Sequence, residues 1–179
     1  MKTFFTLFPT AIGHCGIAWG ERGITGVWLP EVSAGALRRR IARRLPGSRE
    51  ARPTEEVRRT IDGIVALLSG APADLSAAPL DLDGVPDFHR RVYALARDIP
   101  PGQTLTYGEL ARRLGDPSQA RAVGQALGAN PIPILIPCHR VLASNGRTGG
   151  FSAPGGVSTK LRLLEIEGAQ ANAIPTLFG

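Results

Sequence analysis

The sequence predicts a mixed α/β protein of two domains, a strand-rich domain over residues 1–85 and a mainly helical domain over residues 86–179. Short apolar runs separated by glycine turns fill residues 3–30, which is typical of strands. The apolar spacing then becomes helical, and after the proline-rich connector at 72–86 short helices alternate with tight turns. With 43% hydrophobic residues, the chain can build a substantial core.

Three strands are expected first, at Phe4–Phe8, Cys15–Trp19 and Ile24–Leu29. The Gly-Glu-Arg-Gly sequence at residues 20–23 is a strong hairpin signal between the second and the third. Together these patterns indicate a β-meander.

Two helices and one short strand complete the N-terminal domain. Leu37, Ile41 and Leu45 recur every four residues among arginines, which predicts an amphipathic helix with a basic outer face. A solvated face explains those arginines better than a DNA contact does. A second helix is expected over 57–68, and a short strand over 80–82 in the connector.

The C-terminal domain contains a helix-turn-helix pattern. After a helix over 88–95, Thr106 and Glu109 form a capping box that begins a short helix. A turn at 115–117 then leads into a second helix over 118–127. Such a pair inserts its second helix into DNA, but the same geometry also occurs in structural bundles.

The sequence Pro-Cys-His-Arg at residues 137–140 supplies a nucleophile beside a base. A free thiol is only about 3% thiolate at pH 7, so a reactive cysteine needs a proton acceptor or a positive field. His139 and Arg140 can supply either for Cys138, although neighbours on an extended strand point to opposite faces. Residues 130–137 bring the chain directly from the second helix to this thiol. A simple regulator would not need a reactive group directly behind its DNA-reading helix.

The net charge and the number of cysteines indicate the kind of partner and the cellular compartment. A net charge of +6 suggests a polyanionic partner such as nucleic acid, although basic proteins of other kinds are common. Two cysteines, Cys15 and Cys138, exclude a disulfide framework and favour a reducing cytoplasm. Cys15 is expected to be a buried strand residue. The apolar start of the chain is interrupted by Pro9 and is interpreted as a strand, and no apolar run is long enough to span a membrane.

The C-terminal half resembles the O6-alkylguanine-DNA alkyltransferases, also called methylated-DNA-protein-cysteine methyltransferases. The motifs that carry the resemblance are Arg-Ala-Val-Gly at 121–124, Asn-Pro at 130–131, Pro-Cys-His-Arg-Val at 137–141, Gly149, Gly155-Gly156, Lys160 and Leu-Leu-x-x-Glu ending at Glu167. The resemblance implies a ribonuclease H-like N-terminal domain and a winged helix-turn-helix-like C-terminal domain. It also implies direct-reversal DNA repair without a cofactor. In that reaction a monomer flips O6-alkylguanine, mainly O6-methylguanine, out of double-stranded DNA and takes up the alkyl group irreversibly, in a single turnover.

The resemblance also implies a role for each residue around the thiol. Cys138 accepts the alkyl group, His139 deprotonates it through a bound water, and Glu167 orients His139. A Cys-His-acid chain is a general way to activate a thiol. Asn130 braces the turn beneath the site, and Lys160 stabilises the thiolate.

A second set of residues is expected to contact DNA. Arg121 resembles the arginine finger that fills the space left by the flipped base, and Ala120 and Gly124 permit close approach of the helix. Tyr107 matches the tyrosine that rotates the target phosphate and hydrogen-bonds the flipped base. Arg140 is assigned to the DNA-binding residues as well.

The expected guanine pocket is lined by Pro133, Val141, Gly149, Phe151 and Ser152. The loop that covers the alkyl group in the family is two residues longer here, at 150–156. Ser152 is therefore predicted to supply the hydroxyl that reaches O6, with Ser158 as the alternative.

No metal site is expected, although some relatives bind zinc in the N-terminal domain. His14, Cys15 and His89 fall short of a closed set of four ligands.

Two other functions remain as alternatives: a non-catalytic lesion sensor of the same fold, and a helix-turn-helix regulator with a reactive cysteine. The retained Cys138 argues against the sensor.

Overall fold

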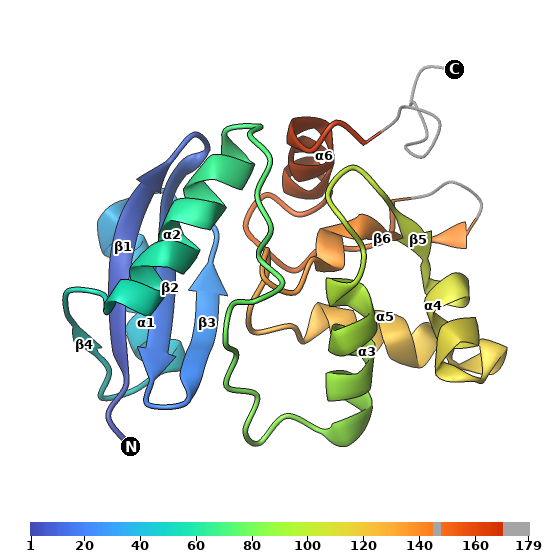
Figure 1. The fold of residues 1–179 in the computed structure, drawn as a ribbon, viewed down its shortest axis with the longest axis horizontal. Coiled ribbons are helices and arrows are strands. Elements are labelled where there is room, and N and C mark those ends of the chain that lie inside the picture. Colours follow the sequence, from blue (N-terminus) through green and yellow to red (C-terminus); the bar gives the residue numbers. More distant parts are fainter. Residues whose placement is uncertain (145–147, 170–179) are drawn as a thin grey trace. The chain divides into compact units, whose positions relative to one another are not determined.

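The computed structural model describes residues 1–144 and 148–169 (Figure 1). The chain divides into two compact units. The N-terminal unit consists of Met1–Asp83 and Pro131–Leu135, and the C-terminal unit of Gly84–Asn130 and the chain from Ile136 onward. A division at residue 85 does not anticipate the return of Pro131–Leu135 to the N-terminal unit. The Val27 amide donates to the Pro131 carbonyl at 3.2 Å, which joins that segment to the edge of the sheet.

A four-stranded sheet forms the centre of the N-terminal unit, in the order β3-β2-β1-β4. Strands β1 (Phe4–Thr10), β2 (Gly13–Gly20) and β3 (Gly23–Trp28) pair in antiparallel fashion, so the predicted meander is confirmed. The two-residue strand β4 (Arg49–Glu50) pairs in parallel with β1. It is too short to leave a periodic signal in the sequence.

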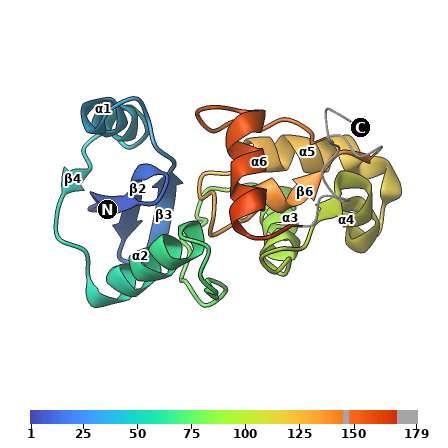
Figure 2. The ribbon, with the colours of Figure 1, turned by 90° about the horizontal axis from the view of Figure 1, so that it is seen from above.

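Two helices cover the sheet, α1 (Ala34–Arg44) on one face and α2 (Glu55–Leu68) on the other (Figures 1 and 2). On the α1 side, strand and helix residues form one apolar cluster, made of Phe5, Ala18, Trp28, Leu37 and Ile41. Gly16 permits this packing, because a Cβ atom there would lie 2.8 Å from Cδ1 of Ile41. Side chains alternate along β2, so Cys15 points to the α2 face.

The strand expected over 80–82 does not form. Leu80 makes a single isolated bridge to Ile24, flanked by hydrogen bonds that Ile24 exchanges with Pro79 and Asp81. One bridge on a connector that turns away provides too few ladder hydrogen bonds for a strand.

The C-terminal unit is mainly helical, with one pair of short parallel strands. Its elements are α3 (Asp87–Arg97), β5 (Leu105–Thr106), α4 (Tyr107–Leu114), α5 (Ala120–Gly128), β6 (Val141–Leu142) and α6 (Val157–Ile166). No helix within the described ranges is long and apolar enough to cross a membrane.

The capping box at the start of α4 is confirmed. The Thr106 hydroxyl accepts from the Glu109 amide at 3.1 Å, and the Glu109 carboxylate accepts from the Thr106 amide at 2.6 Å. The connection to α5 differs slightly from the prediction, because a 3-10 turn over Pro117–Gln119 precedes the α-helix. Asp116 caps this turn by accepting from the Ser118 amide at 2.9 Å.

Candidate active site

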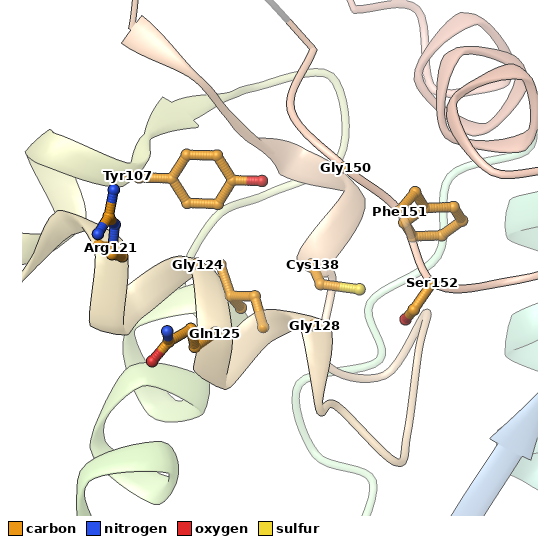
Figure 3. A pocket seen from close by; sticks show the side chains of 10 residues that line it. Tyr107, Arg121, Gly124, Gln125, Gly128, Cys138, Gly150, Phe151 and Ser152 are labelled. Atoms are coloured by element: carbon orange, nitrogen blue, oxygen red, sulfur yellow. The ribbon is translucent and has the colours of Figure 1, made fainter.

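A pocket of about 550 Å³ lies beside helix α5, and all of its lining residues belong to the C-terminal unit (Figure 3). The lining residues are Tyr107, Arg121, Gly124, Gln125, Leu127, Gly128, Cys138, Gly150, Phe151 and Ser152. Figure 3 shows the Cys138 sulfur pointing toward Phe151 and Ser152, with Tyr107 and Arg121 at the other end. The pocket therefore joins an exposed helix to a thiol.

One face of α5 supplies the helical side of the pocket. Arg121, Gly124, Gln125 and Gly128 occupy positions i, i+3, i+4 and i+7 of the helix and so share that face. Arg121 and Gln125 are exposed, whereas the two glycines have no side chain that could fill the pocket. The sequence interpretation missed Gln125 and Gly128, although counting helical turns onward from Arg121 would have found both.

Cys138 begins a 3-10 turn over Cys138–Arg140, and only 9% of the residue is exposed. The turn rotates successive side chains by about 120°, so Cys138 and His139 do not point to opposite faces as they would on a strand. Burial raises the pKa of the Cys138 thiol, while a hydrogen bond from Asn130 and the positive charge of Lys160 act to lower it.

Asn130 also closes the base of the excursion that the chain makes over residues 131–135. Its side-chain amide donates to the Ile136 carbonyl at 2.8 Å, which ties the two ends of the excursion together. Ile134 within it has a φ of 73°, a strained conformation for a β-branched residue. The segment that leads to Cys138 is thus held by the Asn130 hydrogen bond and contains a residue with positive φ.

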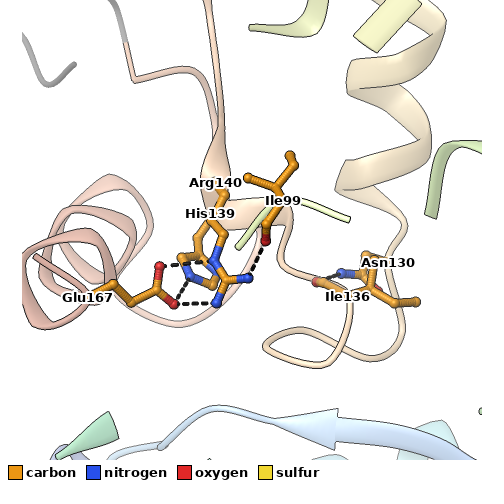
Figure 4. A network of polar contacts seen from close by, with 6 residues as sticks. All are labelled: Ile99, Asn130, Ile136, His139, Arg140 and Glu167. Carbon is orange, nitrogen blue, oxygen red and sulfur yellow. Dashed lines mark hydrogen bonds and ion pairs between the residues drawn. The ribbon is translucent and has the colours of Figure 1, made fainter. Parts of the chain in front are cut away.

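Behind the thiol, Glu167 is the centre of a buried polar network (Figure 4). His139 Nε2 lies 2.7 Å from Glu167 Oε1, and Arg140 donates to Oε1 at 2.8 Å and to Oε2 at 3.0 Å. The third guanidinium contact runs from Arg140 Nη1 to the Ile99 carbonyl at 2.6 Å. Residues 28 positions apart in the sequence are therefore in direct contact.

The network determines which nitrogen of His139 carries the proton. Burial opposes the charge of Glu167, yet hydrogen bonds from His139 and Arg140 lower the pKa of this carboxyl to about 2. An ionised carboxylate can only accept, so Nε2 of His139 donates. Burial lowers the pKa of His139, so the ring is neutral and Nδ1 keeps its lone pair. Nδ1 is buried and has no hydrogen-bond partner in the described part of the chain.

Lys160 is fully buried on α6 and lies close to the same site. Its Nζ donates to the Val141 carbonyl at 2.7 Å and to the Gly150 carbonyl at 3.4 Å, and it lies 5.7 Å from the centre of the Tyr107 ring. Burial lowers the pKa of Lys160 to about 8, against a weaker opposite effect of Cys138. The lysine therefore links strand β6, the loop after it and the pocket.

Tyr107 is half-buried at the start of α4, and burial raises its pKa. Its ring packs closely on Gly149, where a Cβ atom would lie 2.5 Å from the tyrosine hydroxyl. Gly149 has a φ of +70°, so both the space and the backbone require glycine there.

The structure does not support the expected contact of Arg140 with DNA. The residue is 5% exposed, and its guanidinium contacts Glu167 and Ile99. These hydrogen bonds are all made inside the protein. The 3-10 turn directs it inward, and the sequence gives no signal of that direction.

Three expected pocket residues are not among the lining residues. Val141 is fully buried, and its carbonyl is used by Lys160. Gly149 packs on Tyr107, and Pro133 lies in the segment that belongs to the N-terminal unit. Of the five, Phe151 and Ser152 line the pocket, together with Gly150, which was not predicted.

Within the described residues, no group of three or more His, Cys, Asp or Glu side chains could hold a metal ion. Ala120 and Asn130 do not line the pocket.

A buried thiol at a pocket beside an exposed helix, with a histidine-carboxylate pair next to it, is typical of proteins that use cysteine as a nucleophile. A family model described as 6-O-methylguanine DNA methyltransferase, DNA binding domain, matches residues 87–169. A methylated-DNA--protein-cysteine methyltransferase of Methanothermobacter thermautotrophicus is 37% identical over 153 residues, which cover 86% of this chain and 78% of that protein. One of Salmonella typhimurium is 53% identical over 85 residues, 48% of each chain.

Solved structures are similar over nearly the whole chain. The crystal structure of Mycobacterium tuberculosis OGT in complex with DNA has a TM-score of 0.72 at 30% identity and covers 97% of this chain and 96% of that chain. The O6-methylguanine-DNA methyltransferase of Pyrococcus kodakaraensis has a TM-score of 0.70 at 27% identity, with coverage of 92% and 99%. The chain belongs to the methylated-DNA--protein-cysteine methyltransferase family.

Proposed function

We propose that this protein repairs DNA by direct reversal, moving the alkyl group of O6-alkylguanine, mainly O6-methylguanine, to Cys138. The observation that carries the proposal is Cys138 at the pocket, next in sequence to a histidine whose Nε2 is held by Glu167 and whose Nδ1 is left free to accept a proton. A thioether is stable, so each molecule reacts once and is consumed.

The reaction begins with proton transfer from the Cys138 thiol to Nδ1 of His139, through a bound water. Glu167 holds Nε2 and stabilises the imidazolium that forms. The thiolate attacks the alkyl carbon, a carbon-sulfur bond forms, and the bond from that carbon to O6 breaks. The electron pair passes to the purine, which takes up one proton and leaves as guanine.

Groups on the other side of the pocket assist departure of the purine. Tyr107 lines the pocket, and in this proposal its hydroxyl donates a hydrogen bond to the flipped base. Lys160 supplies positive charge near Cys138, which favours the thiolate. Ser152, on the longer loop, supplies the hydroxyl directed at O6.

The alkylated base must leave the duplex, because O6 is paired inside it and an in-line attack needs an open approach. Flipping costs a few kcal/mol. Arg121 on the exposed face of α5 enters the stack and fills the vacated space, while Ala120 and Gly124 let the helix approach closely. In this proposal α4 and α5 form a winged helix-turn-helix-like reader, and the N-terminal unit has a ribonuclease H-like fold.

The protein is proposed to work as a monomer in the cytoplasm on double-stranded DNA, without a cofactor. The two alternatives, a lesion sensor and a regulator, are not favoured, because neither needs a thiol backed by a histidine-carboxylate pair. A regulator would also require a defined operator, whereas a repair protein binds duplex DNA with little sequence preference and a steep salt dependence.

Incubation with a duplex oligonucleotide that carries O6-methylguanine tests the function. Intact-mass spectrometry should show one added methyl group, and peptide mapping should place it on Cys138. Cys138→Ser should remain unmodified while still binding the duplex, and Cys15→Ser is the matched control that reacts like the wild type. Folded wild-type protein that stays unmodified with lesion DNA in excess contradicts the proposal.

A further inference from the structure

Arg140 stands immediately beside the catalytic pair and contacts neither the pocket nor the protein surface. We propose that Arg140 is a positioning residue for proton transfer, which pairs with Glu167 so that His139 rests in its neutral, proton-accepting form. This inference rests on the proposed function and assigns to that site a residue whose place in the sequence suggested a DNA contact.

The geometry shows how Arg140 shares Glu167 with His139. Its Nε and Nη2 atoms donate to Oε2 and Oε1 of the carboxylate, a bidentate arrangement that only arginine provides. His139 uses Oε1 as well, so one carboxylate serves two partners. The bond from Nη1 to the Ile99 carbonyl fixes the guanidinium from a third segment, just beyond the end of α3.

The charges around the ring of His139 determine how readily it binds a second proton. His139 is 1% exposed, and the charged groups that act on its ring are Glu167, Arg140 and Lys160, while the titratable thiol of Cys138 is its neighbour in the sequence. A carboxylate alone at 2.7 Å would favour the imidazolium, and an imidazolium cannot accept another proton. Because Arg140 neutralises the carboxylate and Lys160 is itself cationic, a proton added to the resting ring would increase the net positive charge of a buried site.

The direction in which the His139 pKa is shifted agrees with these charges. Burial is the largest cause that lowers the pKa of His139, and the charges of Arg140 and Lys160 lower it further, against the opposing effect of Glu167. When Cys138 gives up its proton, the negative thiolate balances the new imidazolium, so the net charge of the cluster is unchanged. Proton acceptance by His139 is thereby coupled to formation of the thiolate.

Single-turnover methyl transfer, measured against pH, tests the role in two variants. Arg140→Met should shift the acidic limb of the rate profile upward by about one pH unit, because the freed carboxylate then favours the imidazolium. Arg140→Lys keeps the positive charge but loses the bidentate contact with Glu167. The acidic limb of its rate profile should therefore stay near the wild-type position, even if the rate falls. A uniform loss in Arg140→Met, with the limb unmoved, would leave Arg140 a structural anchor only and overturn the proposal.

A direct titration of the His139 ring by NMR keeps the test independent of turnover and of marginal folding. Arg140→Met leaves a buried carboxylate without its cation, which costs stability, so the double variant Arg140→Met/Glu167→Gln removes both charges together. The imidazole pKa should rise in Arg140→Met and stay near the wild-type value in the double variant. Equal shifts in both variants would reject charge pairing as the cause. If wild-type protein accepts no methyl group, the proposed function fails while this titration still decides the role of Arg140.

Discussion

Cys15 and Cys138 are both buried thiols, one in each unit of the chain, and their surroundings differ in almost every other respect. Cys15 is fully buried in the middle of β2, where burial raises its pKa to about 12 against one weak hydrogen bond with the Thr10 hydroxyl at 3.8 Å. Burial also raises the pKa of Cys138, but there Asn130, Lys160 and two backbone amides oppose it.

Burial by itself disfavours the thiolate and makes a thiol inert, so a buried thiol needs polar partners in order to react. Cys15 is a small apolar residue of a sheet face and adds packing. Cys138 stands on a tight turn at a pocket, next in sequence to His139, the residue proposed to take its proton. Each of these differences can be removed separately.

The largest expected effect is on thiol reactivity. In the folded protein iodoacetamide should modify Cys138 at least about 10³-fold faster than Cys15, because Cys15 lacks both thiolate character and access. Peptide mass spectrometry over a time course measures both rates, and in denaturant they should converge. Comparable rates in the folded protein would mean that the two environments do not differ as the structure indicates.

The next effect concerns the cation near Cys138, which has no counterpart among the groups that influence the Cys15 pKa. Lys160 has a pKa of about 8 instead of 10.5, so between those values the folded protein binds fewer protons than the unfolded chain. The free energy of unfolding should therefore rise with pH across that window, by up to about 3 kcal/mol relative to Lys160→Met. Denaturant unfolding at several pH values measures this difference, and parallel curves for the two proteins would contradict the buried charge.

A smaller effect is expected from Asn130→Ala. The variant loses the hydrogen bond that lowers the Cys138 pKa and the bond to the Ile136 carbonyl, so methyl transfer should slow by about tenfold near neutral pH. The loss should shrink as the pH rises, because hydroxide then forms the thiolate unaided. Thr10→Val removes the corresponding partner of Cys15 and should leave the transfer rate unchanged. A loss of the same size at every pH would mean that Asn130 acts only on the backbone.

Most secondary structure could be predicted because its causes are local. The glycine turns around 11–13 and 20–23, the capping box at Thr106 and the four-residue spacing of Leu37 and Ile41 each act within a few residues of the chain. Strand β4 was not predicted, because two residues are too few to show a periodic pattern. The strand expected over 80–82 did not form, because Leu80 makes only one isolated bridge to Ile24.

The site shows a similar division between local and long-range causes. The candidate nucleophile Cys138 and the adjacent His139 could be predicted from the sequence, and the motif match pointed to Glu167, because these depend on residue type and order. The inward direction of Arg140 toward Glu167, and the presence of Gln125 and Gly128 but not Val141 in the pocket lining, could be seen only once the chain was folded. A tight turn and the approach of α6 set those directions, and contacts between residues 27 positions apart leave no local pattern in a sequence.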